Sequence, residues 1–233
     1  MRIAEITESK EQALAYATHA HQGQTRSGGA PYISHPVRVA NIVQQYKKSH
    51  NIDELIQAAY LHDTIEDTDT THEALQDLFG GLVASLVLEL TSDLEQIKKI
   101  GKKDYLAKKM AHELSSWGLV IKLADRLDNV SDIATAKDAK WRAKYKAETA
   151  HIMDYLEQNR VLSGTHKKLI SLIRAKINEV PATEINEFAT DGFNGMPEGP
   201  KPDSNGYYHY ILFYLWPGPD GRSGAHGSKN VKS

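Results

Sequence analysis

Residues 58–67 read AAYLHDTIED and join an apolar helical pattern directly to polar side chains. The second half of this stretch carries a histidine and three carboxylates, His62, Asp63, Glu66 and Asp67. A buried carboxylate is costly unless it is paired or bound to a cation. On one continuous helix, Glu66 and Asp67 follow Asp63 by three and four residues and share its face. The stretch therefore predicts a helix face that can bind a cation.

Two further polar side chains stand within or beside apolar helical sequence. Asp125 lies inside the segment VIKLADRLDN, with Asn129 one turn later, and His35 follows the loop sequence PYIS. Together with His62 and Asp63 they offer two imidazoles and two carboxylates. Such mixed nitrogen and oxygen ligands suit manganese, iron or zinc. Any one of these residues alone is more often structural, and their combination is what predicts a metal site.

The composition of the chain changes near residue 181. Six of the 8 prolines and half of the 16 glycines lie at or beyond Pro181, whereas the sequence before it shows helical spacing with few breakers. We therefore expect an all-α domain over residues 1–180, a bundle of about eight to ten helices, and a Gly/Pro-rich tail over residues 181–233.

Local signals give approximate helix boundaries. Ser9 with Gln12 is typical of a capping box, and Ser34 is expected to cap a helix with Pro36 in its first turn. A further helix is expected to end at 80–81 and another to run from there to about 90. The remaining expected helices span residues 9–21, 53–66, 102–114, 116–136, 140–158 and 164–178.

The tail contains one segment of high β propensity. Residues 207–216 read YYHYILFYLW and predict a single strand, whereas residues 218–233 are expected to lack regular structure. A lone apolar strand is not stable in water. The segment must pack on the helical domain, pair with another chain or mark an unstable end, which leaves a homo-oligomer open.

Composition also excludes several classes of protein. The formal net charge is −2, so we expect no nucleic-acid partner, and any anionic ligand must meet a local basic patch. The absence of cysteine excludes disulfides and thiol chemistry and favours an intracellular location. We expect no apolar run close to the ~18–20 residues that a membrane-spanning helix needs, and residues 1–5 lack the apolar core of a signal peptide. The expectation is a soluble, cytoplasmic protein without a membrane partner.

Four motifs resemble those of one known family. The segments are HQGQTR at 21–26, PYISHP at 31–36, LHDTIEDT at 61–68 and KLADRLDN at 122–129. They resemble the hydrolase domain of RelA/SpoT proteins, which are HD-domain phosphohydrolases, and still more its stand-alone form, the small alarmone hydrolases related to metazoan SpoT homologues. The resemblance runs from about residue 10 to residue 178 and implies an HD-domain helical bundle.

The resemblance also implies an activity and a set of site residues. The activity is a manganese-dependent removal of pyrophosphate from the 3′ position of guanosine tetra- and pentaphosphate (ppGpp and pppGpp), giving GDP or GTP. Glu66 and Asp67 match an acidic pair that positions or deprotonates the attacking water. The metal ligands implied are His35, His62, Asp63 and Asp125. Zinc or iron could replace manganese.

The substrate implied by the resemblance is a nucleotide with several negative charges. Arg26 matches a phosphate contact, Tyr32 and Asn129 match residues lining the nucleotide pocket, and Thr149 more loosely matches a position near the nucleoside. Lys122 adds positive charge on the helix of Asp125. Asp128 departs from the pattern, because the long enzymes commonly have His and the metazoan ones Tyr at this position. The departure affects the residues expected to line the nucleotide pocket and none of the four implied metal ligands.

Two other functions stay open from the sequence. The same metal site could act on NADPH at its 2′-phosphate or on adenosine alarmones, and sequence cannot separate these substrates. A nucleotide-binding regulatory or antitoxin-like module is the alternative from another class. Such a module predicts the loss of a ligand or of the Glu-Asp pair, and all six residues are present here.

Overall fold

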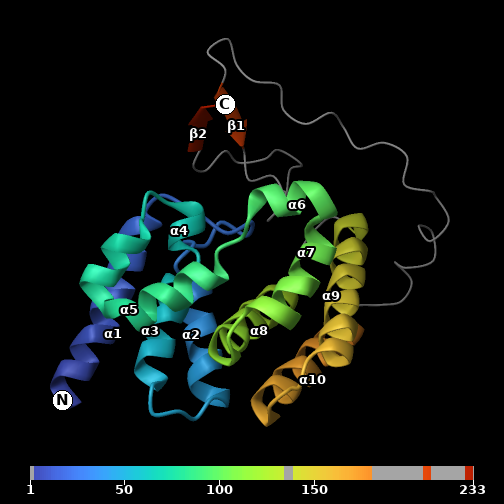
Figure 1. Ribbon diagram of the computed structural model, residues 1–233, viewed down its shortest axis with the longest axis horizontal. Helices are drawn as coiled ribbons and strands as arrows, with labels where there is room; N and C mark the ends of the chain where they lie inside the picture. The colour runs from blue at the N-terminus through green and yellow to red at the C-terminus, as the bar shows by residue number, and fades with distance from the viewer. Residues whose placement is uncertain (1–2, 134–138, 180–206, 211–228, 233) are drawn as a thin grey trace.

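The computed structural model describes residues 3–133, 139–179, 207–210 and 229–232, and within them the domain is the expected all-α bundle (Figure 1). The helices are α1 (Ile3–Ala20), α2 (Ser34–Tyr46), α3 (Ile52–Leu61), α4 (Thr64–Asp67), α5 (His72–Leu90), α6 (Leu94–Ile100), α7 (Lys102–Lys108), the π-helical turn η1 (Lys109–Glu113), α8 (Ser116–Ser131), α9 (Ala139–Asn159) and α10 (Gly164–Glu179).

Helices α3 and α8 form the centre of the bundle. Helix α3 packs against α1, α2 and α5, whereas α8 packs against α2, α5 and α10. Helices α7 and α9 pack against each other at the right of the view in Figure 1. Both central helices are covered on several sides, so most of their residues are buried. The polar side chains held inside the molecule on these helices are Gln57, Asp125, Arg126 and Asp128.

The expected helix over residues 53–66 is interrupted at the deciding stretch. Helix α3 ends at Leu61, and α4 begins at Thr64. His62 Nδ1 lies 2.9 Å from the Ala59 carbonyl oxygen, and Thr64 Oγ1 donates to the Leu61 carbonyl at 2.7 Å. Side chains thus take carbonyls that a continuing helix would give to backbone N–H groups. The prediction of one continuous helix was wrong, and the break places His62 and Asp63 at a helix end.

Both predicted helix caps were also wrong. Helix α1 begins at Ile3, so Ser9 lies inside it. Helix α2 has Ile33 at its N-cap position without a side-chain cap bond, and Ser34 Oγ donates instead to the Pro31 carbonyl at 2.8 Å. The loop before α2 is therefore closed by local turns of the chain.

Residues His72–Ile100 include a helix long and apolar enough, by length and composition, to cross a membrane, so the expectation that no such run exists was wrong. One such helix is weak evidence, because a core helix passes the same test. Here Gly80 adopts φ 83° and ψ 164° inside α5, where the sequence predicted a helix end, and a break separates α5 from α6. The inward side of α5 contributes Leu75, Val83 and Val87 to the core.

The predicted helix over residues 102–114 consists of α7 followed by the π-helical turn η1. Arg160 Nη1 donates to the carbonyls of Met110 and Leu114 at 2.8 Å each. A wide turn leaves carbonyl oxygens without regular helical partners, and the guanidinium satisfies them. Helix α6 was not expected, and α8 ends at Ser131, before the expected end at residue 136.

The tail contributes two strands to the described residues. Strand β1 (Tyr207–Tyr210) pairs antiparallel with β2 (Lys229–Lys232), with Tyr207 opposite Lys232. The strand prediction is confirmed for 207–210, and 211–216 lie outside the described residues. The prediction of no regular structure was wrong for 229–232, because a partner strand further along the chain is not visible in local propensity.

Candidate metal centre

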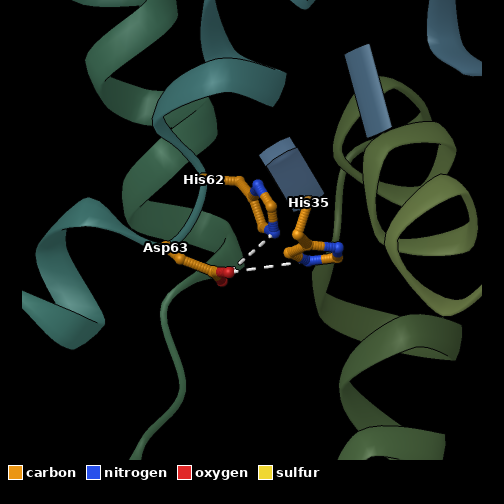
Figure 2. Close-up of side chains that lie close together, drawn as sticks. All are labelled: His35, His62 and Asp63. Carbon is orange, nitrogen blue, oxygen red and sulfur yellow. Dashed lines mark ion pairs between the residues drawn. The ribbon is translucent and has the colours of Figure 1, made fainter. Parts of the chain in front are cut away.

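Three side chains from two separate motifs converge at the centre of the bundle. His35 lies in the first turn of α2, whereas His62 and Asp63 occupy the break after α3. Each offers one ligand atom, and these atoms all lie within 4.8 Å of one another. Figure 2 shows the two imidazoles and the carboxylate turned toward one another. The structure thus brings together three of the four predicted metal ligands in one cluster.

The ring of His62 has one nitrogen in a hydrogen bond and one without. Nδ1 donates to the Ala59 carbonyl at 2.9 Å, whereas the buried Nε2 makes no hydrogen bond, even though Asp63 Oδ2 lies 3.0 Å away. Burial lowers the pKa of His62, but the Asp63 carboxylate outweighs it and raises the pKa to about 9. The site therefore attracts positive charge at Nε2, and a metal ion bound there would displace a proton from this nitrogen.

His35 is oriented in the same way. Its Nδ1 lies 2.6 Å from Asp128 Oδ2, and its Nε2 lies 3.3 Å from Asp125 Oδ1 and 3.7 Å from Asp63 Oδ2. The ring is almost completely buried, at 1% exposure. With Nδ1 donating to a carboxylate, Nε2 is the nitrogen that can bind a cation.

Asp125 reaches the cluster from α8, and both of its oxygens already have partners. Lys122 Nζ lies 3.0 Å from Oδ2, and Asn129 donates to Oδ1 at 2.6 Å. Burial would raise the pKa of Asp125, yet Lys122 and the two histidines hold it well below its usual range. Asp125 is thus an ionised carboxylate beside His35. Its role as a fourth ligand stays a prediction.

The donor set fits a divalent cation. Burial would raise the pKa of Asp63, but His62 holds it well below its usual range, so the carboxylate is ionised. His35, His62 and the ionised Asp63 carboxylate each place one ligand atom in the cluster, and the ionised Asp125 carboxylate lies 3.3 Å from His35 Nε2. A cation there would offset the negative charge of these buried carboxylates. The cluster can therefore hold a metal ion of the kind that imidazole and carboxylate bind.

Asp67 and Tyr32 adjoin the metal cluster. The Tyr32 hydroxyl donates to Asp63 Oδ2 at 2.5 Å and to Asp67 Oδ2 at 3.3 Å. Asp67 Oδ1 is buried without a hydrogen bond. Burial, followed by the charges of Asp63 and Glu66, raises the pKa of Asp67 to about 8. Tyr32 thus ties the two carboxylates together, a contact that the sequence did not predict.

Glu66 is the other predicted catalytic residue, and it faces a different partner. Its Oε2 accepts a hydrogen bond from the backbone N–H of Ser92 at 2.9 Å. This bond links α4 to the segment that follows α5. The Glu66 carboxylate is therefore fixed in direction.

Arg26 and Asn129, both predicted to contact the substrate, are bonded to each other. Arg26 Nη2 donates to Asn129 Oδ1 at 3.0 Å and to Asp132 Oδ2 at 3.3 Å. Since Asn129 also donates to Asp125, the loop before α2 is connected to the metal cluster through side chains. Asp132 was not predicted, because its partners lie about a hundred residues away along the chain.

Positive charge gathers on the other side of Asp125. Lys122 lies against Asp125, and burial lowers the pKa of Lys102, which Glu66 raises and Arg126 and Lys122 lower further. Lys102 was missed because it stands among ordinary surface lysines in sequence. Together Lys102, Lys122 and Arg126 form a local basic patch. A chain with a net charge of −2 would need such a patch to bind an anionic ligand.

Thr149 lies beneath this patch. Its hydroxyl is fully buried, donates to the Tyr145 carbonyl at 2.8 Å and lies 3.5 Å from Arg126 Nη1. Arg126 also lies over the Tyr145 ring, 4.9 Å from its centroid. Thr149 therefore supports Arg126, and a direct contact between Thr149 and substrate stays a prediction.

His21 and Gln24 complete the surroundings and were not assigned as site residues from the sequence. His21 Nδ1 lies 2.8 Å from Gln24 Oε1, and Gln24 Nε2 donates to the Asp67 carbonyl at 3.0 Å. The ring of His21 packs on Tyr32, with centroids 4.7 Å apart. Burial lowers the pKa of His21, which favours a neutral ring. These contacts hold Tyr32 and Asp67 in place.

Known proteins resemble this chain over the same region. The chain matches the HD domain over residues 13–161. The bifunctional (p)ppGpp synthase/hydrolase SpoT of Escherichia coli (strain K12) is 41% identical over 146 residues, which cover 60% of this chain and 20% of SpoT. The chain thus matches about a fifth of the length of that relative.

Metazoan relatives are matched over most of their length. The guanosine-3′,5′-bis(diphosphate) 3′-pyrophosphohydrolase MESH1 of Danio rerio is 36% identical over 158 residues, 66% of this chain and 82% of MESH1. A solved structure, described as a metazoan ortholog of SpoT that hydrolyzes ppGpp and plays a role in starvation responses, superposes with a TM-score of 0.60 at 29% identity, covering 72% of this chain and 95% of that one. The chain is thus a member of the HD-domain family, of the type represented by SpoT and its metazoan homologues.

Proposed function

We propose that this protein is a metal-dependent hydrolase that removes pyrophosphate from the 3′ position of ppGpp and pppGpp, leaving GDP or GTP. The observation that carries the proposal is the convergence of His35, His62 and Asp63 within 4.8 Å. Relatives matched over most of their length, MESH1 of Danio rerio among them, bear the name of this activity. The substrate is inferred from that likeness.

In this proposal His35, His62, Asp63 and Asp125 hold the metal ion. A bound divalent ion lowers the pKa of a water molecule and draws negative charge off phosphoryl oxygens. Lys122 and Asn129 restrain the Asp125 carboxylate at 3.0 and 2.6 Å. These bonds keep Asp125 directed at the position that it shares with His35.

Asp67 is proposed as the base that takes a proton from the attacking water. Its pKa, raised to about 8, makes the ionised carboxylate a stronger base than an ordinary aspartate, and Asp67 must release its own proton before it accepts one from water at neutral pH. Its Oδ1 is available, because the atom is buried and has no hydrogen bond. Glu66 is proposed to orient the same water, with its carboxylate held by the Ser92 N–H.

Substrate phosphates are proposed to meet positive charge on two sides. Arg26 approaches from the loop before α2, and Lys122, with Lys102 and Arg126 behind it, approaches from α7 and α8. A guanidinium forms paired hydrogen bonds with phosphate oxygens, which suits Arg26 to this role. For the nucleoside we propose Asn129 and Tyr32 as contacts and Thr149 as a more distant one.

A substrate panel tests this function. Metal-free protein is incubated with Mn²⁺ and ppGpp, pppGpp, NADPH or an adenosine alarmone, and the released phosphate or pyrophosphate is measured. We expect pyrophosphate from ppGpp, and none after EDTA treatment. Equal turnover in EDTA rejects the metal-dependent reaction, and a higher kcat/KM for NADPH or an adenosine alarmone reassigns the substrate. Nucleotide binding without turnover favours the regulatory module.

Three finer points belong to the same proposal. We propose Mn²⁺ as the ion, with Zn²⁺ or Fe²⁺ as substitutes, and the cytoplasm as the location of the protein.

We also propose that the aromatic segment at 207–216 joins two copies of the chain. Deletion of residues 181–233 with mass measured by light scattering tests the last point, and an unchanged mass rejects it.

A further inference from the structure

Asp128 is placed to act on the metal centre through His35. Its Oδ2 lies 2.6 Å from His35 Nδ1, and the side chain is buried, at 4% exposure. Histidines that bind metals commonly donate their other ring N–H to a carboxylate, which fixes the tautomer and the direction of the ring.

Arg38 holds Asp128 in that orientation. Its Nε donates to Asp128 Oδ1 at 2.6 Å, and its Nη2 donates to Oδ2 at 3.0 Å, so the pair is bidentate. A buried carboxylate with two guanidinium bonds has little freedom to rotate. Arg38 Nη2 also donates at 2.9 Å to Asp132, the carboxylate that accepts from Arg26.

We propose that the Arg38–Asp128 pair is a positioning device, which keeps the proton of His35 on Nδ1 and aims Nε2 at the metal position. The proposal rests on the metal centre of the proposed function and does not depend on which nucleotide is hydrolysed. A purely structural ion pair would contribute to folding and leave the affinity for metal unchanged.

The main test measures Mn²⁺ affinity of the full chain by competition with a chelator. We expect Asp128→Ala to weaken Mn²⁺ binding by about 10–100-fold, and Asp128→Asn, which retains an oxygen that can accept from His35, to weaken it less. The matched control is Asp154→Ala, which removes a partner of Arg174 at 2.6 Å on the surface of α9 and α10. This control should bind Mn²⁺ like the wild type.

A spectroscopic test covers the case in which Asp128→Ala does not fold. In the zinc-loaded wild type, ¹H–¹⁵N NMR should detect a strongly hydrogen-bonded Nδ1–H on His35, and in Asp128→Asn its resonance should move while that of His62, bonded to Ala59, stays. Folded Asp128→Ala with wild-type Mn²⁺ affinity, or a wild-type His35 without a proton on Nδ1, overturns the proposal. A wild type that binds Mn²⁺ but hydrolyses no alarmone rejects the proposed function alone.

Discussion

Two buried polar regions of this molecule contain histidines of nearly equal burial, and they differ in how many polar atoms are satisfied. In the candidate metal centre, His62 is 2% exposed, and its Nε2 has no hydrogen bond but lies 3.0 Å from Asp63 Oδ2. At the start of α10, His166 is also 2% exposed, but Nε2 lies 2.9 Å from the Ser116 carbonyl and Nδ1 accepts from the Ser163 N–H at 3.2 Å.

The pKa values of the two histidines also differ between the two regions. Asp63 raises the pKa of His62 to about 9 against the effect of burial, whereas burial lowers the pKa of His166, with Arg160 and Lys47 adding to the decrease. Burial of a histidine therefore says little about its role. The carboxylate beside His62 favours positive charge at its Nε2, whereas both ring nitrogens of His166 are hydrogen-bonded to the backbone.

The largest expected effect comes from exchanging each histidine for glutamine. We expect His62→Gln to lower the hydrolysis of ppGpp by about 10²–10³-fold, on the scale of losing a major electrostatic group in a catalytic site. His166→Gln should retain wild-type kcat/KM, since it touches no predicted site residue. The comparison breaks if the two variants lose activity to a similar degree.

Asp67→Asn should lower kcat by about 10²–10⁴-fold, the usual contribution of a general base. The amide cannot accept the proton, while its size preserves the contact with Tyr32. Asp69→Asn, an exposed carboxylate two residues later, serves as the control and should be silent. An Asp67→Asn variant with kcat above a tenth of the wild-type value excludes Asp67 as the base.

Metal addition should stabilise the protein through one of the two regions only. At a Mn²⁺ concentration of 100 times Kd, binding adds about 2.7 kcal/mol to the free energy of unfolding, which raises Tm by about 5–10 °C. Differential scanning fluorimetry should show this rise in wild type and His166→Gln, and EDTA should reverse it. A rise of the same size in His62→Gln places the ion somewhere else.

The division between these regions was partly visible in the sequence. The apolar spacing predicted the all-α domain. His35, His62 and Asp63 were predicted as site residues because they are polar side chains within or beside apolar helical sequence, where a polar group needs a partner. The break after α3 was not predicted, since helical periodicity continues through Thr64 and the carbonyl contacts of His62 and Thr64 that end the helix are local side-chain bonds.

Long-range partners account for most of the rest. Asp128 meets His35 and Arg38 across about ninety residues, and Lys102 approaches Glu66 only through the packing of α7. Nothing in local spacing distinguishes these charged residues from solvated ones. Arg160 was missed for the same reason, because the carbonyls that it satisfies belong to a π-helical turn fifty residues earlier.

Arg160→Met tests the region around His166, in which buried polar atoms have hydrogen-bond partners. The substitution removes the guanidinium that donates to the carbonyls of Met110 and Leu114. Met preserves much of the aliphatic volume but leaves the carbonyls of Met110 and Leu114 without their partner, which should cost about 1–3 kcal/mol in the free energy of unfolding. Urea denaturation measures the loss. The Tm rise with Mn²⁺ should stay at its wild-type size, and a smaller rise would mean that the two regions are coupled.

The smallest effect is the pH dependence of His166. Its pKa in the folded protein lies below the ordinary value of about 6.5, so the unfolded chain binds the proton more readily. The hydrogen bonds of His166 therefore contribute their full stability above pH 6.5, and this stability is lost as the pH falls below 6.5 toward the folded pKa. His166→Gln should consequently be more destabilising at pH 7.5 than at pH 5.5 in urea titrations with EDTA. A destabilisation that is equal at both pH values, or larger at pH 5.5, would show that His166 is held in its charged form, and the contrast between a paired neutral histidine and a cation-binding one would then disappear.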